Sequence, residues 1–224
     1  MTVFVLVHGG WHGGWCWQEV AERLRCSGHR VYTPTLTGLA DRSHLFSADI
    51  DLDTHIADVV NLARWEDLSE FVLCGHSYGG MVITGAADAL RGRVSAAVYL
   101  DAFLPTDGDW LFDLAGWPTP TQIAMPTPST AAFGLAETYR SRVDPKLTPH
   151  PTRTGVQMLH LTSTDPVAPR RTYVLATGWA GLEHFHDSYR RAVLDPSWTA
   201  ISLDGSHELM FDRAEAVAEV LAHA

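Results

Sequence analysis

The sequence predicts an α/β fold: a mostly parallel sheet of about six strands, helices on both faces, and a small cap inserted after the fourth strand. Short apolar runs alternate with segments of helical periodicity along the chain. The runs are apolar throughout, which is typical of parallel strands that helices cover on both sides. Several chemically suggestive residues directly follow these runs, where ligands of such sheets bind.

Six apolar runs are expected to be strands, and five segments between them are expected to be helices. In Leu52–Trp65, apolar residues recur at the spacing of one helix face. The expected strands are Thr2–Val7, Arg30–Thr33, Phe71–Cys74, Ala96–Leu100, Arg171–Ala176 and Trp198–Leu203. The expected helices are Trp15–Cys26, Leu52–Trp65, Gly80–Leu90, Leu182–Leu194 and Asp212–Ala222.

One region breaks this alternation. The stretch from Pro105 to Thr152 contains eight prolines and no sustained strand–helix pattern. A structureless loop of that length is uncommon in a compact domain and is usually functional. We expect residues 105–152 to form a cap, with helical pieces near Asp109–Leu114 and Ala131–Val143, inserted into a core of residues 1–104 and 153–224. A poorly ordered insertion is the alternative.

The bulk composition excludes several classes of protein. A chain of 224 residues can form one domain with a substantial core, and its formal charge of −10 comes without any lysine- or arginine-rich run. Nucleic acid and anionic membranes are therefore poor candidates as partners. The three cysteines and the absence of a signal-like start lead us to expect a cytoplasmic protein.

The most informative stretch is Gly75-His76-Ser77-Tyr78-Gly79, which follows the apolar run Phe71–Cys74. The pattern G-x-S-x-G is typical of a strand–turn–helix that lifts a nucleophilic serine above the strand ends. The flanking glycines let strand and helix pass closely without Cβ clashes. The N–H of Tyr78 would lie at a helix N-terminus, where a developing oxyanion is stabilised. An ordinary glycine-rich turn is the alternative.

Two further segments stand where this chemistry needs them. The first apolar run ends in the glycine-rich loop His8–Trp15, which can supply a second oxyanion donor. Near the other end of the chain, the last expected strand leads to Asp204-Gly205-Ser206-His207. A histidine just past a late strand can reach back to Ser77 as a general base. These placements favour His207 among the twelve histidines and disfavour the simple turn.

The carboxylate that would orient His207 is expected to be Asp101, which directly follows the run ending at Leu100. That strand should neighbour the strand of Ser77, which would bring its C-terminal end beside the loop of His207. Alternatively, Asp101 only begins the cap, and serine and histidine act as a dyad. Four other carboxylates are less well placed or cannot be placed: Asp165, Glu183, Asp187 and Asp204.

These segments resemble the α/β-hydrolase superfamily, in particular the branch of plant methyl esterases and hydroxynitrile lyases with their bacterial esterase relatives. Four matching segments cover nearly the whole chain in the family's order: Val5–Trp15, Cys74–Met81, Ala97–Pro105 and Gly205–His207. The resemblance implies the α/β-hydrolase fold, with Ser77 as the nucleophile and His207 as the base. It also implies that the backbone N–H groups of Gly10 and Tyr78 are the oxyanion donors.

The chain departs from this family at two places. The lyases carry a threonine and a lysine where this chain has Gly9 and Glu208. Without the lysine, nothing evident stabilises a departing cyanide, so hydroxynitrile lyase activity is disfavoured. Relatives also place the triad aspartate near Thr177–Trp179, where this chain has no carboxylate, and this absence leaves Asp101 as our candidate.

We therefore expect a serine hydrolase that cleaves small to medium, uncharged, apolar carboxylic esters through an acyl-enzyme. Trp11 and Trp110 are our candidates for substrate contact. A lactone or thioester hydrolase would use the same groups, and a ligand-binding protein with little turnover could keep the same fold. No metal-ligand motif is present, and we expect neither metal nor cofactor. The exact substrate and the oligomeric state stay open.

Overall fold

The six apolar runs form one fully parallel sheet in the computed structural model, which describes residues 1–224. All six expected strands are confirmed, in the spatial order β2-β1-β3-β4-β7-β8. Their bounds are β1 Val3–Val7, β2 Arg30–Tyr32, β3 Phe71–His76, β4 Val94–Leu100, β7 Arg170–Ala176 and β8 Trp198–Leu203. The strand of Ser77 therefore lies between β1 and β4, which places the ends of these three strands side by side.

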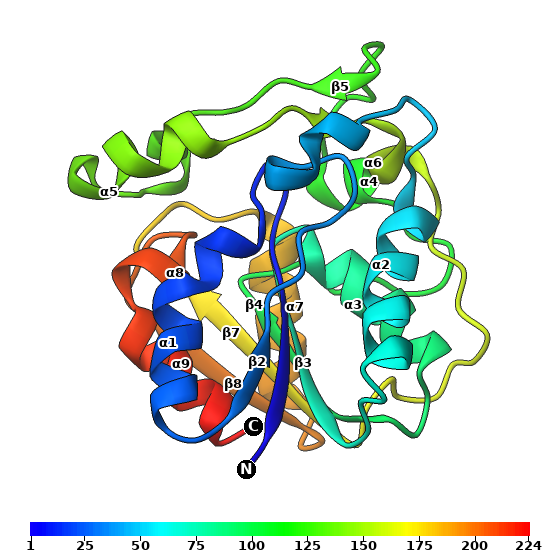
Figure 1. The fold of residues 1–224 in the computed structure, drawn as a ribbon, viewed down its shortest axis with the longest axis vertical. Coiled ribbons are helices and arrows are strands. Elements are labelled where there is room, and N and C mark those ends of the chain that lie inside the picture. The colour runs from blue at the N-terminus through cyan, green and yellow to red at the C-terminus, as the bar shows by residue number, and fades with distance from the viewer.

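Helices cover both faces of the sheet, as the apolar strands predict. One core of 25 buried residues joins the sheet to α1 (Gln18–Cys26), α8 (Leu209–Asp212) and α9 (Ala214–Ala222). The other, of 30 buried residues, joins it to α2 (Leu52–Trp65), α3 (Gly79–Ala89) and α7 (Glu183–Leu194). Figure 1 shows α1 and α9 on one side of the strands and α2 and α3 on the other. Every residue of β3 is buried between these layers.

The helix boundaries follow local backbone chemistry. α2 begins and ends where the sequence predicts. At its start, the Asp51 carboxylate accepts the Thr54 N–H at 3.0 Å and caps the first turn. The expected helix from Trp15 starts instead as a 3₁₀ turn, η1 (Gly14–Trp17), before α1. The last expected helix, Asp212–Ala222, begins instead at Ala214, because Arg213, with φ −136°, leaves the helical conformation and separates α9 from the short α8, which the sequence did not predict.

The insertion, residues 105–152, follows β4 and is built from short elements. The helical piece expected near Asp109–Leu114 is present with shifted bounds, whereas the piece expected near Ala131–Val143 is broken at Gly134 into a 3₁₀ turn and a helix. The insertion also contains a two-stranded antiparallel ribbon that the sequence did not predict. The elements are α4 Leu111–Ala115, β5 Ala124–Met125, η3 Thr130–Phe133, α5 Glu137–Val143, η4 Asp144–Lys146 and β6 His150–Pro151. Two other short helices lie outside it, η2 Ala40–Leu45 and α6 Arg153–Val156. Figure 1 shows the insertion across the C-terminal ends of the strands.

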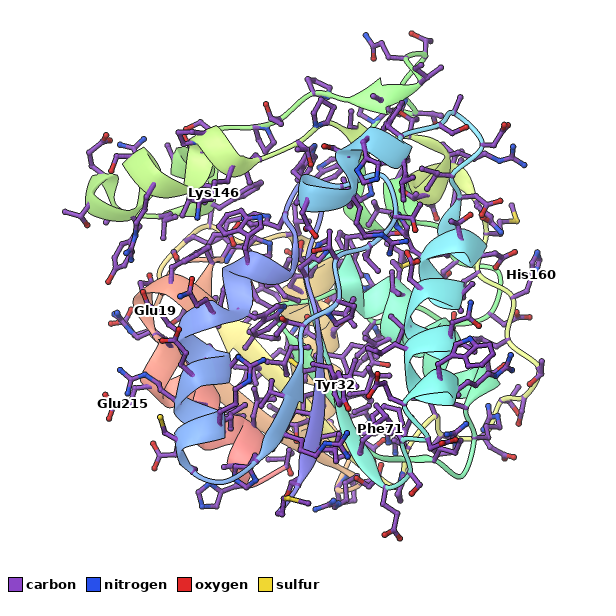
Figure 2. All side chains as sticks on the ribbon, viewed as in Figure 1. Glu19, Tyr32, Phe71, Lys146, His160 and Glu215 are labelled. Carbon is purple, nitrogen blue, oxygen red and sulfur yellow. The ribbon has the colours of Figure 1, made fainter.

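Charged and aromatic contacts hold the insertion to the core. The Lys146 ammonium lies 4.9 Å from the centre of the Trp15 ring, and Arg142 pairs with Glu19 of α1 at 3.3 Å. Figure 2 shows Lys146 above the helix that carries Glu19. Each contact is partly exposed and contributes about 1 kcal/mol or less. No helix of the protein has the length and apolar character needed to cross a membrane.

Candidate active site

Ser77 occupies a strained turn between β3 and α3. Its φ is +52°, a left-handed conformation that non-glycine residues rarely adopt. A Cβ on Gly75 would lie 2.6 Å from the Gly79 carbonyl oxygen, and one on Gly79 would lie 2.8 Å from the Val7 carbonyl oxygen. Both glycines are therefore required by close backbone approach, as the motif predicts. The strain at Ser77 is of the kind that clusters at active sites.

Two backbone N–H groups beside Ser77 are available to a ligand. Neither Gly10 nor Tyr78 donates its N–H to a backbone carbonyl of the protein. Tyr78 opens α3, and its side chain points away to His55, where its hydroxyl donates to Nδ1 at 2.9 Å. Gly10 lies on the loop after β1 and lines the same cavity as Ser77. A carbonyl oxygen that becomes negative beside Ser77 could accept hydrogen bonds from such donors.

His207 lies on the loop after β8, where Asp101 meets its imidazole. Nδ1–H of His207 donates to Oδ2 of Asp101 at 2.6 Å, and the Asp101 side chain is fully buried. Asp101 directly follows β4, which pairs with β3 on one side and β7 on the other. The hydrogen bond fixes the tautomer in which Nε2 of His207 can accept a proton.

Two further donors hold the Asp101 carboxylate. Oδ1 accepts the backbone N–H of Ala176 at 2.9 Å, and Oδ2 accepts Nε1–H of Trp179 at 2.9 Å. These donors come from the end of β7 and the loop that follows. The segment in which the sequence showed no carboxylate therefore binds the carboxylate of the neighbouring strand.

Aromatic rings surround the imidazole of His207. The Trp179 ring lies 4.6 Å away between centroids, and the Phe185 ring stacks on it at 5.6 Å with an interplanar angle of 17°. The His207 N–H donates to the carbonyl of Phe133 in the insertion at 3.0 Å. No direct hydrogen bond joins His207 to the Ser77 hydroxyl, which is common in catalytic pairs without substrate.

Further polar groups border the same cavity. Nε2–H of His76 donates to the His207 carbonyl at 3.0 Å, and burial lowers the pKa of His76 well below its usual value. The ring is therefore neutral. Glu208, almost fully buried, pairs with His12 at 3.4 Å between Oε2 and Nε2. The position that carries lysine in the lyases thus holds a paired carboxylate.

The cavity above Ser77 is small and largely aromatic, with a volume of about 40 Å³. Its lining includes Trp11, as expected, and Trp117 from the insertion, but not Trp110, which is half-buried at the start of α4. The lining residues are Gly10, Trp11, His12, His76, Ser77, Phe103, Trp117, Phe133, Trp179, Leu182, Phe185, His207 and Glu208. Of our candidates, Ser77, His207, Gly10 and Trp11 therefore meet in this cavity. Asp101 and Tyr78 do not line it: Asp101 is hydrogen-bonded to His207, and Tyr78 directly follows Ser77.

Sequence reasoning did not select several of these wall residues as candidates. Trp117 and Phe133 lie in the proline-rich insertion, where no periodicity fixes the direction of a side chain. Trp179 lies in the loop where relatives carry their acid. The missing carboxylate was the only sign that this loop contacts the site.

This fold and site define the α/β hydrolases. The family model described as "Alpha/beta hydrolase family" matches residues 4–220 of the chain. The chain is 36% identical to the carbendazim hydrolyzing esterase of Nocardioides sp. (strain SG-4G), over 99% of both chains. It is also 36% identical to Methylesterase 1 of Arabidopsis thaliana, over 46% of this chain and 40% of that protein.

Solved structures agree on the fold. An extracellular alpha/beta-hydrolase from a Paenibacillus species superposes with a TM-score of 0.84 at 23% identity, covering 100% of this chain and 99% of that one. The chain belongs to the alpha/beta hydrolase family and is related to plant methylesterases, hydroxynitrile lyases and bacterial esterases. It is a carboxylic ester hydrolase.

Proposed function

We propose that this esterase cleaves small to medium, uncharged, apolar esters through an acyl-enzyme on Ser77. The observation that carries the proposal is the 2.6 Å hydrogen bond between His207 and Asp101, in the cavity that Ser77 lines. Ser77 Oγ attacks the ester carbonyl while Nε2 of His207 takes its proton. His207 then gives this proton to the leaving alkoxide as the carbon–oxygen bond breaks.

A water molecule completes the cycle in the same site. His207 takes a proton from the water, whose oxygen attacks the acyl carbon, and then returns a proton to Ser77 as the acid leaves. Asp101 stabilises the imidazolium that forms in each half-reaction. The N–H groups of Gly10 and Tyr78 bind the oxyanion of each tetrahedral intermediate.

The cavity wall supports the proposed substrate class. Seven of its thirteen lining residues are hydrophobic, and its carboxylate, Glu208, is paired with His12. A charged substrate would find no free partner of opposite sign there. Because the cavity, at about 40 Å³, is small, esters with a short acyl chain should fit best without movement of the wall. Carbendazim, after which the relative is named, belongs in the panel of test substrates.

We propose that residues 105–152 act as the cap of this site, on a core of residues 1–104 and 153–224. The insertion supplies Trp117 and Phe133 to the cavity wall, and the carbonyl of Phe133 binds the backbone of His207. Larger substrates would enter by displacement of these two aromatic side chains.

The geometry also supports hydrolysis over cyanohydrin cleavage. A Cβ on Gly9 would lie 2.9 Å from both His76 Nδ1 and Ser77 Cβ, so the lyase threonine does not fit beside this His76. Glu208 stands where the lyases carry a lysine, so this position supplies no cation to stabilise a departing cyanide.

The test is pre-steady-state hydrolysis of p-nitrophenyl acetate and butyrate. We expect a burst of p-nitrophenol from the wild type, an acetyl adduct on Ser77 by mass spectrometry, and no burst from Ser77→Ala. Undiminished turnover by Ser77→Ala would contradict the proposal. A panel of ethyl butyrate, γ-butyrolactone and a butyryl thioester compares kcat/KM among the three reactions, and ligand-induced stabilisation without turnover of any of them would indicate a binding protein.

We also propose that the enzyme works in the reducing cytoplasm. All three cysteines, Cys16, Cys26 and Cys74, are free thiols in the structure, and two are buried. Fractionation of the native host with an antibody against the chain tests this, and recovery in the culture medium would contradict it.

A further inference from the structure

The insertion binds the backbone of the glycine-rich loop His8–Trp15 at both polar groups of Trp11. The Trp11 carbonyl accepts the N–H of Thr148 at 3.0 Å, and the Trp11 N–H donates to Nδ1 of His150 at 3.3 Å. Both polar backbone groups of Trp11 are therefore satisfied by one short segment of the insertion. No residue of the core makes a hydrogen bond to either of these two backbone groups.

This binding holds an unfavourable conformation. Trp11 has φ +64°, which is rare for a bulky residue and persists only when neighbouring groups impose it. The peptide between Gly10 and Trp11 is fixed at both ends, because the Gly10 carbonyl accepts the His12 N–H and Nδ1–H, each at 2.8 Å. His12 holds the oxygen of this peptide unit and His150 holds its N–H.

Without these hydrogen bonds, packing alone would not hold the conformation of Gly10. A Cβ added there would meet only Nδ1 of His150, at 3.8 Å. A glycine in open space can rotate about its own φ and ψ at little cost. The Gly10 N–H, our proposed oxyanion donor, belongs to the peptide whose oxygen, the Gly9 carbonyl, accepts Nδ1–H of His8 at 2.8 Å. Because glycine turns freely on its following side, the position of Gly10 also depends on the anchoring of the Gly10–Trp11 peptide by His12 and His150.

The surroundings of His150 select the tautomer that can accept a hydrogen bond at Nδ1. Its side chain is fully buried, and Nε2–H donates to the Thr154 hydroxyl at 2.8 Å. That hydroxyl donates in turn to the Pro151 carbonyl at 2.7 Å, which leaves its oxygen free to accept. The ring also packs edge-on against Tyr78, the residue of the other proposed donor, at 4.8 Å between centroids. Burial lowers the pKa of His150 well below its usual value, so the ring stays neutral.

We propose that His150 is a positioning residue of the oxyanion hole: through the Trp11 N–H it holds the Gly10 N–H toward the reacting carbonyl, so that docking of the insertion completes the catalytic site. This role rests on the proposed serine esterase mechanism. It explains why an isolated histidine between two prolines is buried against the loop that follows β1.

The experiment compares His150→Asn with His150→Gln. The Asn amide oxygen can occupy the place of Nδ1, whereas the Gln amide reaches only the place of Nε2. We expect His150→Asn to keep kcat for p-nitrophenyl acetate within about fivefold of the wild type. We expect His150→Gln to lose about 10²-fold in kcat with little change in KM, as for a misplaced oxyanion donor. Binding of a trifluoromethyl ketone, whose Ser77 adduct carries an oxyanion, should weaken by the same factor.

His160→Ala is the matched control, because His160 is exposed at the outer edge of the molecule (Figure 2). If the His150 variants unfold at the assay temperature, Thr154→Val and Thr154→Ser replace them. Loss of the hydroxyl leaves Nε2–H of His150 without the acceptor that holds the ring in place, so only the valine variant should lose kcat.

Two results would overturn the role of His150. One is a kcat within threefold of the wild type for His150→Gln or for folded Thr154→Val. The other is an equal loss in the Asn and Gln variants or, in the substitute pair, in the Val and Ser variants. Absence of Ser77-dependent turnover in the wild type would instead overturn the proposed function itself.

Discussion

Replacement of Asp101 by asparagine tests the proposed triad most directly. The backbone at this position accepts the change, because Asp101 has φ +44° and asparagine adopts this region as readily as aspartate. The side chain is isosteric but loses its charge and gains a donor. The substitution therefore alters the chemistry around His207 without altering the packing.

The three hydrogen bonds at the carboxylate determine the size of the effect. If the amide NH₂ faces His207, it forces Nδ1 to accept and places the proton on Nε2, where it blocks removal of the Ser77 proton. It then also opposes Nε1–H of Trp179. If the amide is reversed, its NH₂ opposes the N–H of Ala176. Each orientation leaves at least one buried donor unpaired, which costs about 1–3 kcal/mol of stability.

The expected catalytic loss is larger than this loss of stability. A triad aspartate replaced by asparagine can lower kcat by about 10⁴-fold. That factor corresponds to about 5.4 kcal/mol of transition-state stabilisation. KM should change little, because Asp101 lies behind His207 and does not line the cavity.

The assay is the steady-state hydrolysis of p-nitrophenyl acetate, with urea unfolding to confirm that the variant is folded. Asp204→Asn is the matched control, because Asp204 is only three residues from His207 but its side chain is exposed. A loss below tenfold in folded Asp101→Asn would refute the triad and favour a serine–histidine dyad. A large loss in the control would assign the acid to Asp204.

Three further predictions concern stability and cofactors. Burial lowers the pKa of His8 to about 3 and that of His55 to about 4, so the unfolded chain, titrating near ~6.5, binds more protons below that pH. Stability should therefore fall with falling pH, by about 2 kcal/mol per histidine at pH 5, and equal unfolding free energies at pH 7.5 and pH 5 would contradict this. Gly80→Ala should destabilise by about 3 kcal/mol or more, or fail to fold, because its Cβ would lie 2.0 Å from the Phe103 carbonyl oxygen; a wild-type melting temperature would disprove the clash. EDTA should leave esterase activity unchanged, since no three His, Cys, Asp or Glu side chains are grouped to hold a metal ion; a loss that zinc restores would reverse that expectation.

The sequence predicted the sheet well because its signals are local. Continuous apolar runs identified all six strands, and the one-face spacing of apolar residues in Leu52–Trp65 predicted both ends of α2. The insertion was harder to predict because prolines remove the periodicity on which such predictions depend. The ribbon of β5 and β6 has two residues in each strand, which is too short for alternation to be visible.

The residues of the candidate site also divide into those with a local sequence signal and those without one. The elbow of Ser77 and the loop of His207 carry recognisable spacing, and strand adjacency selected Asp101. His150 and Trp179 carry no such signal, because each acts through a single hydrogen bond across the fold. The loop direction that turns Trp179 toward Asp101 comes from tertiary contacts that no short pattern encodes.

The position of Asp101, our proposed acid, follows from the sheet itself. In the parallel pairing of β4 with β7, Leu100 lies opposite Val174, and the Asp101 N–H donates to the Val174 carbonyl at 2.7 Å. The residues that follow these two strands therefore share one small space beside the imidazole of His207. A carboxylate from either strand end can reach Nδ1, provided that the other strand end supplies donors instead of a second negative charge. Here Ala176 and Trp179 are those donors, so the missing acid after β7 and the buried Asp101 after β4 are two parts of one arrangement.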